Sequence, residues 1–478
     1  MIRPSLPPGP GLRPKPRPPR PAAVALPPWG VLEWFTVAQT FMPALLFIPG
    51  ITAVRTATRV AAYMLGFAAW GAVVFSPRRG TTAGSFPAKP WLLAAMAWLV
   101  LSLANPNSYS PMAAIGHVML YISIMSPAFW AGEAVGSPRQ LRRVITILFL
   151  CNATSASVGL GQVFYPDRFN PPVIPIMAHE GADQLYYETA DGRKILRPCG
   201  LTDSPGAAAP AGAAAALFGL CIALQPLPLW KRGASMGLAF IGVAVIYYSQ
   251  VRSSLVMLGI CLSTVTGLLM YRGDHRSAAK LVGGGVLMFG GALLWVARTI
   301  GHRVFDRFGT LLDNNPANFY ARNRGTYLFH AIESLGKYPL GYGLGWWGMV
   351  HLAFRNPLRL SPIWVEVMPQ ALAVDGGIPL TFFYSVAVAV AMADSVRIVM
   401  KTRDREIGFW GSLVVAQNLG SVALCFSYPT FLSPTGLQFW MLAATLHAAE
   451  AQSSGAARAL KSRVKLPRLR HPRPGPAL

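Results

Sequence analysis

Long apolar runs separated by shorter polar segments dominate the chain from residue 31 to residue 449. They lie near 31–50, 58–75, 91–105, 112–132, 144–163, 206–224, 236–250, 253–271, 281–297, 378–400, 407–426 and 437–449. A helix of about 20 residues crosses a hydrocarbon core of about 30 Å. The pattern therefore predicts an all-α polytopic membrane protein, with about twelve transmembrane helices forming one bundle over residues 29–449.

Two long polar stretches interrupt this pattern, at about 164–205 and 298–377. In the second, apolar residues recur at helical spacing between Arg324 and Gly336, and Gly336 followed by Pro339 is typical of a helix end. We therefore expect short helices within a large loop. Series of small residues at 206–220 and 283–294 predict faces where helices pack closely.

Composition agrees with a membrane location and gives an orientation. Hydrophobic residues make up 53% of the 478 residues, charged residues 13%, and the net charge is +24. Such a charge on a soluble protein would suggest nucleic acid, but most of the 42 Lys and Arg residues lie in the tails and in alternate short loops. We expect a disordered, Pro-rich basic tail at 1–28 and a basic tail at 450–478, both cytoplasmic, with the two long loops outside and membrane lipids as partners.

Neither the cysteines nor the glycines follow a metal or nucleotide motif, so no metal or cofactor is expected. There is no internal repeat, and no acidic residue lies in the middle of an apolar run. A transporter or flippase for lipid-linked glycans, which is kept as an alternative of another class, would be expected to have both an internal repeat and such acidic residues. A non-catalytic membrane subunit is a further alternative.

Two arginines are candidates for binding an anion at the outward face. Arg252 joins two apolar runs with almost no loop between them, and Arg324 lies on the apolar face of its predicted helix. An arginine placed there must find an anion, because leaving it desolvated and unpaired is costly. The alternatives are a lipid phosphate for Arg252 and an ion pair with Asp306 or Glu333 for Arg324.

The two long loops contain further polar candidates. Arginine outnumbers lysine in them, and the guanidinium fork matches phosphate, which suits a diphosphate ligand. Trp346 and Trp347 are expected to stack on sugars or to lie in the interfacial aromatic belt. The further candidates are Arg197, Arg322, His330, His351, Glu366 and Asp375.

Several short motifs together resemble the O-antigen ligase/polymerase superfamily. They are RPCGLTDSP before a small-residue run, SQVRSSL between two runs, Arg324 followed by PLGYGLG, and DGGIPL at the start of a run. The resemblance implies a twelve-helix bundle of the bacterial inner membrane. It also implies transfer of a polyprenyl-diphosphate-linked glycan to a sugar hydroxyl at the outer face, without metal or nucleotide. Arg252 and Arg324 match the two arginines that hold the diphosphate, and Arg197 matches a weaker one.

The chain departs from this family at the position of its histidine. Counting back from Gly377-Ile378-Pro379 places Glu366 where the ligases carry the His proposed as general base. We therefore expect a polymerase of exopolysaccharide or O-antigen repeat units, with Glu366 as base and export or chain-length proteins as further partners. O-antigen ligase, acting on lipid A core, is the alternative within the superfamily. A loop carboxylate paired with Arg355 or Arg359 is the alternative for Glu366.

Overall fold

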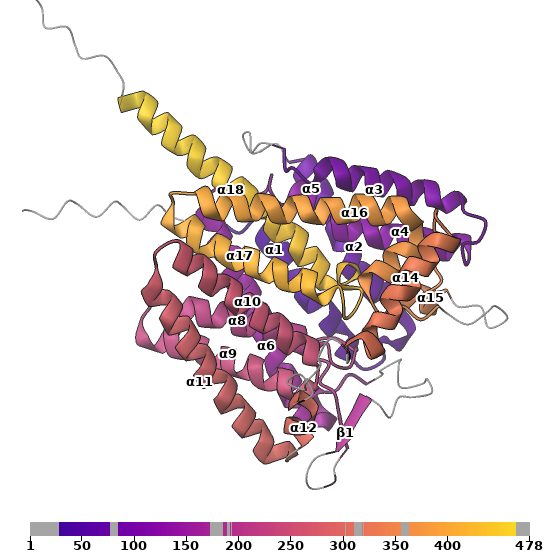
Figure 1. The fold of residues 1–478 in the computed structure, drawn as a ribbon, viewed down its shortest axis with the longest axis horizontal. Helices are drawn as coiled ribbons and strands as arrows, with labels where there is room; N and C mark the ends of the chain where they lie inside the picture. The colour runs from indigo at the N-terminus through magenta and orange to yellow at the C-terminus, as the bar shows by residue number, and fades with distance from the viewer. Residues whose placement is uncertain are drawn as a thin grey trace, which may run out of the picture.

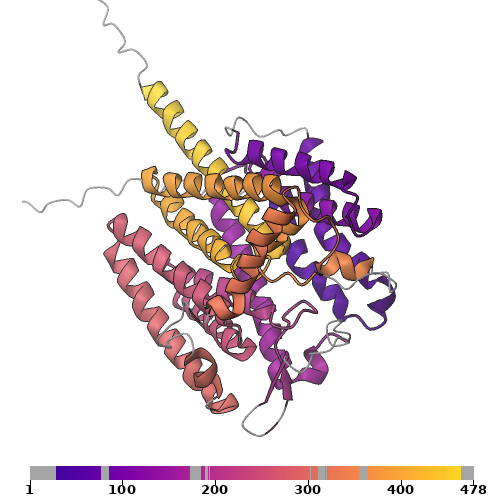
Figure 2. The same cartoon turned by 45° about the vertical axis from the view of Figure 1, so that its right-hand side comes forward.

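A computed structural model describes residues 28–76, 85–172, 185–188, 192, 194–301, 303–309, 318, 320–354 and 363–464. The predicted N-terminal tail, apart from Pro28, lies outside these residues, as do Arg355 and Arg359. Of the predicted C-terminal tail, residues 450–464 continue the last helix, which extends beyond the bundle in Figures 1 and 2.

The described part of the chain is almost entirely helical. A two-stranded antiparallel hairpin, β1 (Tyr186–Glu188) and β2 (Lys194–Leu196), pairs Tyr187 with Ile195. A π-helical turn over Ala321–Gly325 precedes α14. The helices are α1 Val31–Phe41, α2 Arg55–Val74, α3 Lys89–Leu101, α4 Pro111–Met125, α5 Pro127–Trp130, α6 Arg139–Phe164, α7 Pro166–Phe169, α8 Ala208–Ala223, α9 Leu229–Ser249, α10 Arg252–Tyr271, α11 His275–Ile300, α12 Arg303–Gly309, α14 Thr326–Lys337, α15 Gly348–Ala353, α16 Met368–Lys401, α17 Arg405–Leu424 and α18 Pro434–Val464.

The protein is an all-α membrane protein. Within the described residues, seven helices are long and apolar enough to cross a membrane: Pro111–Trp130, Arg139–Phe164, Leu229–Ser249, Arg252–Tyr271, His275–Ile300, Met368–Lys401 and Arg405–Leu424. The apolar segments Val31–Phe47, Val60–Val74, Lys89–Ala104 and Ala208–Ala223 are shorter. Every apolar run in the sequence thus overlaps a helix, and within the described residues seven of these segments have the length and composition of a span. The number of twelve spans stays a prediction.

Small residues allow the central helices to approach closely. α8 is buried along nearly its whole length, and a Cβ added to Gly212 would lie 2.4 Å from the carbonyl oxygen of Gly242 on α9. The prediction from the small residues at 206–220 is therefore supported by the packing. At 283–294 the packing is looser: a Cβ added to Gly291 on α11 would lie 3.5 Å from Phe240 on α9, an ordinary contact, whereas one added to Gly283 or Gly290 would meet nothing within 4 Å.

The loops predicted to be cytoplasmic lie together at one end of the bundle. Arg272, after α10, donates to the carbonyl oxygens of Val399 (2.6 Å) and Thr402 (3.3 Å) at the end of α16. The hydroxyl of Thr402 in turn donates to Glu450 of α18 at 2.9 Å. In Figure 1 the α10–α11 and α16–α17 turns lie on the same side of the molecule. This contact pattern agrees with the alternation of loop charge.

Loops predicted to face outward gather at the opposite end. The hairpin, α12, α14 and α15 all lie there, on the right and lower right of Figure 1. Arg55, at the start of α2, donates from Nε to Asp203 at 2.9 Å and so joins the first of the long loops to the N-terminal helices. Which end faces the cytoplasm remains a prediction from the charges.

The second long loop ends earlier than the sequence indicated. α16 begins at Met368, and residues 368–377 are helical and mostly buried rather than part of a loop that ends at 377. The helix is broken at Gly377, whose φ of 63° is left-handed, and the amide of Ile378 donates to the carbonyl oxygen of Pro339 at 2.8 Å. Only glycine fits here, because an added Cβ would lie 2.2 Å from that oxygen.

Candidate functional site

Arg252 lies at a tight turn between two long helices. Gln250, between α9 and α10, has a left-handed φ of 53°, which reverses the chain and makes Arg252 the first residue of α10. The hydroxyl oxygens of Ser249 and Ser254, on either side of this turn, are buried and have no hydrogen-bond partner among the described residues. Buried hydroxyl groups without partners are rare in folded proteins, which makes this turn a candidate for contact with a ligand.

Arg197 follows the hairpin in a loop that α6 holds rigidly. The side chain of Gln162 on α6 accepts from the amides of Cys199 (2.7 Å) and Gly200 (3.0 Å) and donates to the carbonyl oxygen of Gly200 (2.9 Å). Asp203 in the same loop is paired with Arg55. The RPCGLTDSP motif therefore acts as a support that fixes the position of Arg197.

Four arginines from different segments form one cluster, which we call the arginine cluster: Arg197, Arg252, Arg307 and Arg324. The charges of Arg307 and Arg252 act on Arg197, and those of Arg307 and Arg324 act on Arg252. Burial and then these like charges lower the pKa of the Arg197 guanidinium, and its buried Nε atom has no hydrogen-bond partner in the part of the chain that the structure describes. Burial also lowers the pKa of Arg324. Bringing like charges together out of water is unfavourable unless an anion compensates them.

Arg307 is the member that the sequence did not identify. It lies on α12, whose residue Phe308 packs its ring edge-on against Tyr247 of α9, with centroids 5.1 Å apart. Val304 and Phe308 are buried on the same short helix. Those two apolar residues at helical spacing, with an arginine beside them, are the signal in the sequence that could have indicated an anchored helix.

Glu366 pairs with Arg324. One carboxylate oxygen of Glu366 contacts the Arg324 guanidinium, and the other accepts from the indole nitrogen of Trp364 at 2.6 Å. The side chain of Gln370 accepts from the Glu366 amide at 3.1 Å and so fixes the backbone. The partner of Arg324 is therefore neither Asp306 nor Glu333. The structure brings the predicted base and a predicted diphosphate ligand into direct contact.

Arg322 and His330 are exposed. Arg322 lies with Arg324 in the π-helical turn that precedes α14, a geometry often found at functional sites. His330 is 3.5 Å from Glu333 on the solvent-facing side of α14, and Glu333 also accepts from Lys337 at 2.7 Å. This arrangement on α14 is a surface ion-pair group apart from the Arg324–Glu366 contact.

The Asp375 carboxylate is held by buried hydrogen bonds. Asp375 is fully buried on α16, where its carboxylate accepts from the Tyr121 hydroxyl (2.8 Å) and the Trp347 indole nitrogen (2.9 Å). His117 of α4 lies 3.6 Å from it and accepts from the amide of Gly345 at 3.1 Å. Since both carboxylate oxygens of Asp375 are occupied or approached by buried partners, it is not placed to take a proton from a substrate.

His351 is also held inside the protein, against α4. Its ring centroid is 4.4 Å from that of Tyr109, and its Nδ1 lies 3.2 Å from the carbonyl oxygen of Gly345. Neither His351 nor Asp375 has a described contact with the arginine cluster.

The tryptophan pair is neither exposed to sugars nor part of an interfacial belt. Trp346 and Trp347 are 9% and 6% exposed, and the Trp346 indole nitrogen donates to the carbonyl oxygen of Asn107 at 2.6 Å. The glycines before them allow the backbone to pack directly: a Cβ added to Gly343 would lie 2.8 Å from Asn107. The PLGYGLG motif therefore anchors the segment after α14 to α4 and α16.

Comparison of the chain with protein-family models finds no match, and neither does comparison with curated proteins. Among the described residues, no group of three or more His, Cys, Asp or Glu side chains could hold a metal ion. The argument for function therefore rests on the arginine cluster, on Glu366 and on the motifs in the sequence.

Proposed function

We propose that the protein is a membrane glycosyltransferase that polymerises polyprenyl-diphosphate-linked oligosaccharide repeat units at the outer face of the bacterial inner membrane. The observation that carries the proposal is the contact between Glu366 and Arg324, a member of the arginine cluster. Four arginines provide the charge and the bidentate geometry that a diphosphate requires, and the adjacent carboxylate is a candidate base. The resemblance to the O-antigen ligase/polymerase superfamily adds the class of donor.

In the proposed reaction, Arg197, Arg252 and Arg324 bind the diphosphate of the donor, and Arg307 is the fourth ligand. The acceptor sugar hydroxyl attacks the anomeric carbon of the donor and forms the new glycosidic bond. The bond from that carbon to the diphosphate oxygen breaks, and polyprenyl diphosphate leaves with its developing charge stabilised by the guanidinium groups. The hydroxyl proton passes to Glu366.

The Arg324–Glu366 pair couples donor binding to the base. Without donor, the carboxylate holds the Arg324 guanidinium. A bound diphosphate carries more charge and offers bidentate acceptors, so it competes with Glu366 for that guanidinium. Once Arg324 turns to the diphosphate, Glu366 is released to accept the proton of the acceptor. The base is thus available only when a donor is present.

A deletion strain tests the class of product. Loss of long surface polymer, with accumulation of single lipid-linked repeat units, is the expected result for a polymerase. Long polymer that remains attached to its lipid carrier instead of lipid A core would favour the ligase, and unchanged polymer length with units trapped at the cytoplasmic face would favour a flippase. Restoration by the wild-type chain but not by Arg324→Lys at equal protein level would tie the effect to the arginine cluster.

A further inference from the structure

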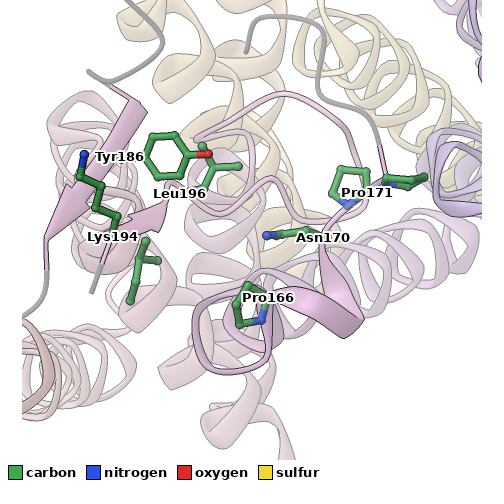
Figure 3. A pocket seen from close by; sticks show the side chains of 8 residues that line it. Pro166, Asn170, Pro171, Tyr186, Lys194 and Leu196 are labelled. Atoms are coloured by element: carbon green, nitrogen blue, oxygen red, sulfur yellow. The ribbon is translucent and has the colours of Figure 1, made fainter. Parts of the chain in front are cut away.

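A partly open cavity lies at the same end of the bundle as the arginine cluster. Its volume is about 360 Å³, within the size range of small-molecule sites. One wall is the segment that follows α6, and the other is the hairpin of β1 and β2 (Figure 3). The lining residues are Pro166, Asn170, Pro171, Pro172, Tyr186, Lys194, Ile195 and Leu196.

The first wall is held by Gln162, which also fixes the loop that carries Arg197. The amide nitrogen of the Gln162 side chain donates to the carbonyl oxygen of Phe169, directly before Asn170, at 3.0 Å, and to that of Gly200 at 2.9 Å. On the hairpin side, the amide of Arg197 donates to the carbonyl oxygen of Leu185 at 3.0 Å. Leu196 lines the cavity and Arg197 belongs to the cluster, so the two sites are adjacent along the backbone.

The lining has the chemistry of a sugar-binding site. Tyr186 provides an aromatic ring and a hydroxyl group, and in Figure 3 this hydroxyl points toward the side of the cavity where Asn170 lies. An aromatic ring packs on the C–H face of a pyranose, and an amide offers both a donor and an acceptor to sugar hydroxyls. The proline rings and Leu196 supply apolar walls, and Lys194 lies on the second strand.

We propose that this cavity binds a saccharide unit of the glycan substrate, with Tyr186 and Asn170 as its main contacts. The inference rests on the proposed function for the identity of the glycan, and the link to that function is that Leu196 of the cavity directly precedes Arg197 of the arginine cluster. The sugar belongs either to the donor or to the acceptor chain, and both present the same chemistry to the cavity.

The test uses the full chain in lipid nanodiscs and measures binding of free oligosaccharides. The probes are an array of bacterial surface glycans and the oligosaccharide released by mild acid from lipid-linked material of a deletion strain. Tyr186→Ala and Asn170→Ala, one on each wall, are expected to weaken binding by about tenfold or more. Tyr165→Ala is the matched control, because Tyr165 is an aromatic residue of the same segment, is 62% exposed and does not line the cavity.

A competition arm separates the two sources of the sugar. If the cavity holds a donor sugar, the free oligosaccharide competes with the lipid-linked repeat unit and binds normally beside bare polyprenyl diphosphate. If it holds the acceptor, the oligosaccharide and the lipid-linked unit bind together. Either pattern supports the site.

No oligosaccharide binding by the wild type, or equal binding by the wild type and both cavity variants, overturns the proposed site. Failure of the proposed function has a different signature: bare polyprenyl diphosphate then does not bind to the wild type. Binding of that lipid is expected to be the same in Tyr186→Ala as in the wild type, so the two readouts are independent.

Discussion

Replacing Glu366 by glutamine distinguishes a catalytic base from a structural ion-pair partner. Glutamine keeps the size of the side chain and still accepts from the indole nitrogen of Trp364, but it cannot take a proton. It also removes the charge that holds Arg324. The two roles therefore predict different effects on stability, turnover and donor binding.

The effect expected for an ion-pair partner and the effect expected for a catalytic base differ clearly in size. The side chains of Arg324 and Glu366 are 39% and 21% exposed, and ion pairs with this much access to water contribute at most about 1 kcal/mol to stability. Loss of a general base costs about 10²- to 10⁴-fold in rate, which is about 3–5 kcal/mol in the barrier. We therefore expect Glu366→Gln to fold normally and to lose nearly all turnover.

The assay compares initial rates of polymer formation from lipid-linked repeat units with the affinity for bare polyprenyl diphosphate. We expect turnover to fall while affinity for the diphosphate stays equal or rises, because Glu366 no longer competes for Arg324. Glu333→Gln is the control, since Glu333 is a paired carboxylate on exposed α14. Turnover by Glu366→Gln within a fewfold of the wild type would refute the assignment of the base. A large loss of diphosphate affinity would refute the competition between Glu366 and the donor.

Other variants test the remaining parts of the account. Arg252→Lys and Arg307→Ala are each expected to weaken binding of polyprenyl diphosphate by about 10- to 100-fold, because each removes hydrogen bonds to a charged group; affinities equal to the wild type would exclude that arginine as a ligand. Asp375→Ala leaves two buried donors without an acceptor, at about 1–3 kcal/mol each, and should lower the thermal unfolding temperature more than Asp375→Asn does; an unchanged temperature would contradict the structural role. Reporter fusions at Pro228 and Lys401 should both give a cytoplasmic signal, and an external signal at Lys401 would contradict the predicted orientation.

The helices could be predicted from the sequence because apolar length and loop charge are local properties of the chain. The tight turn at Arg252 was visible in the same way, since two apolar runs meet there without a loop. The length of each span was harder to predict from the sequence. Residues 368–377 look like the polar end of a loop, but packing against α4 and the loop after α14 buries Asp375 and extends the helix.

The site was predicted only in part, because its contacts join distant segments. Arg252 and Arg324 were recognised from their positions, but the Arg324–Glu366 pair depends on how α14 and α16 pack. Trp347 illustrates the same limit: an indole beside a membrane surface suggests an exposed aromatic group until a buried acceptor, here Asp375, is known. Arg307 was missed because α12 is too short to give a periodic signal over more than one turn.

Transfer by the purified chain tests the central claim most directly. Lipid-linked repeat units are supplied to the protein in nanodiscs, without metal or nucleotide, and the lipid products are identified by mass spectrometry. The account predicts longer lipid-linked glycans, with one polyprenyl diphosphate released for each linkage formed, and no such products from Arg324→Lys or Glu366→Gln. Recovery of the repeat units at unchanged length, with no polyprenyl diphosphate released by the folded wild-type chain, would contradict it.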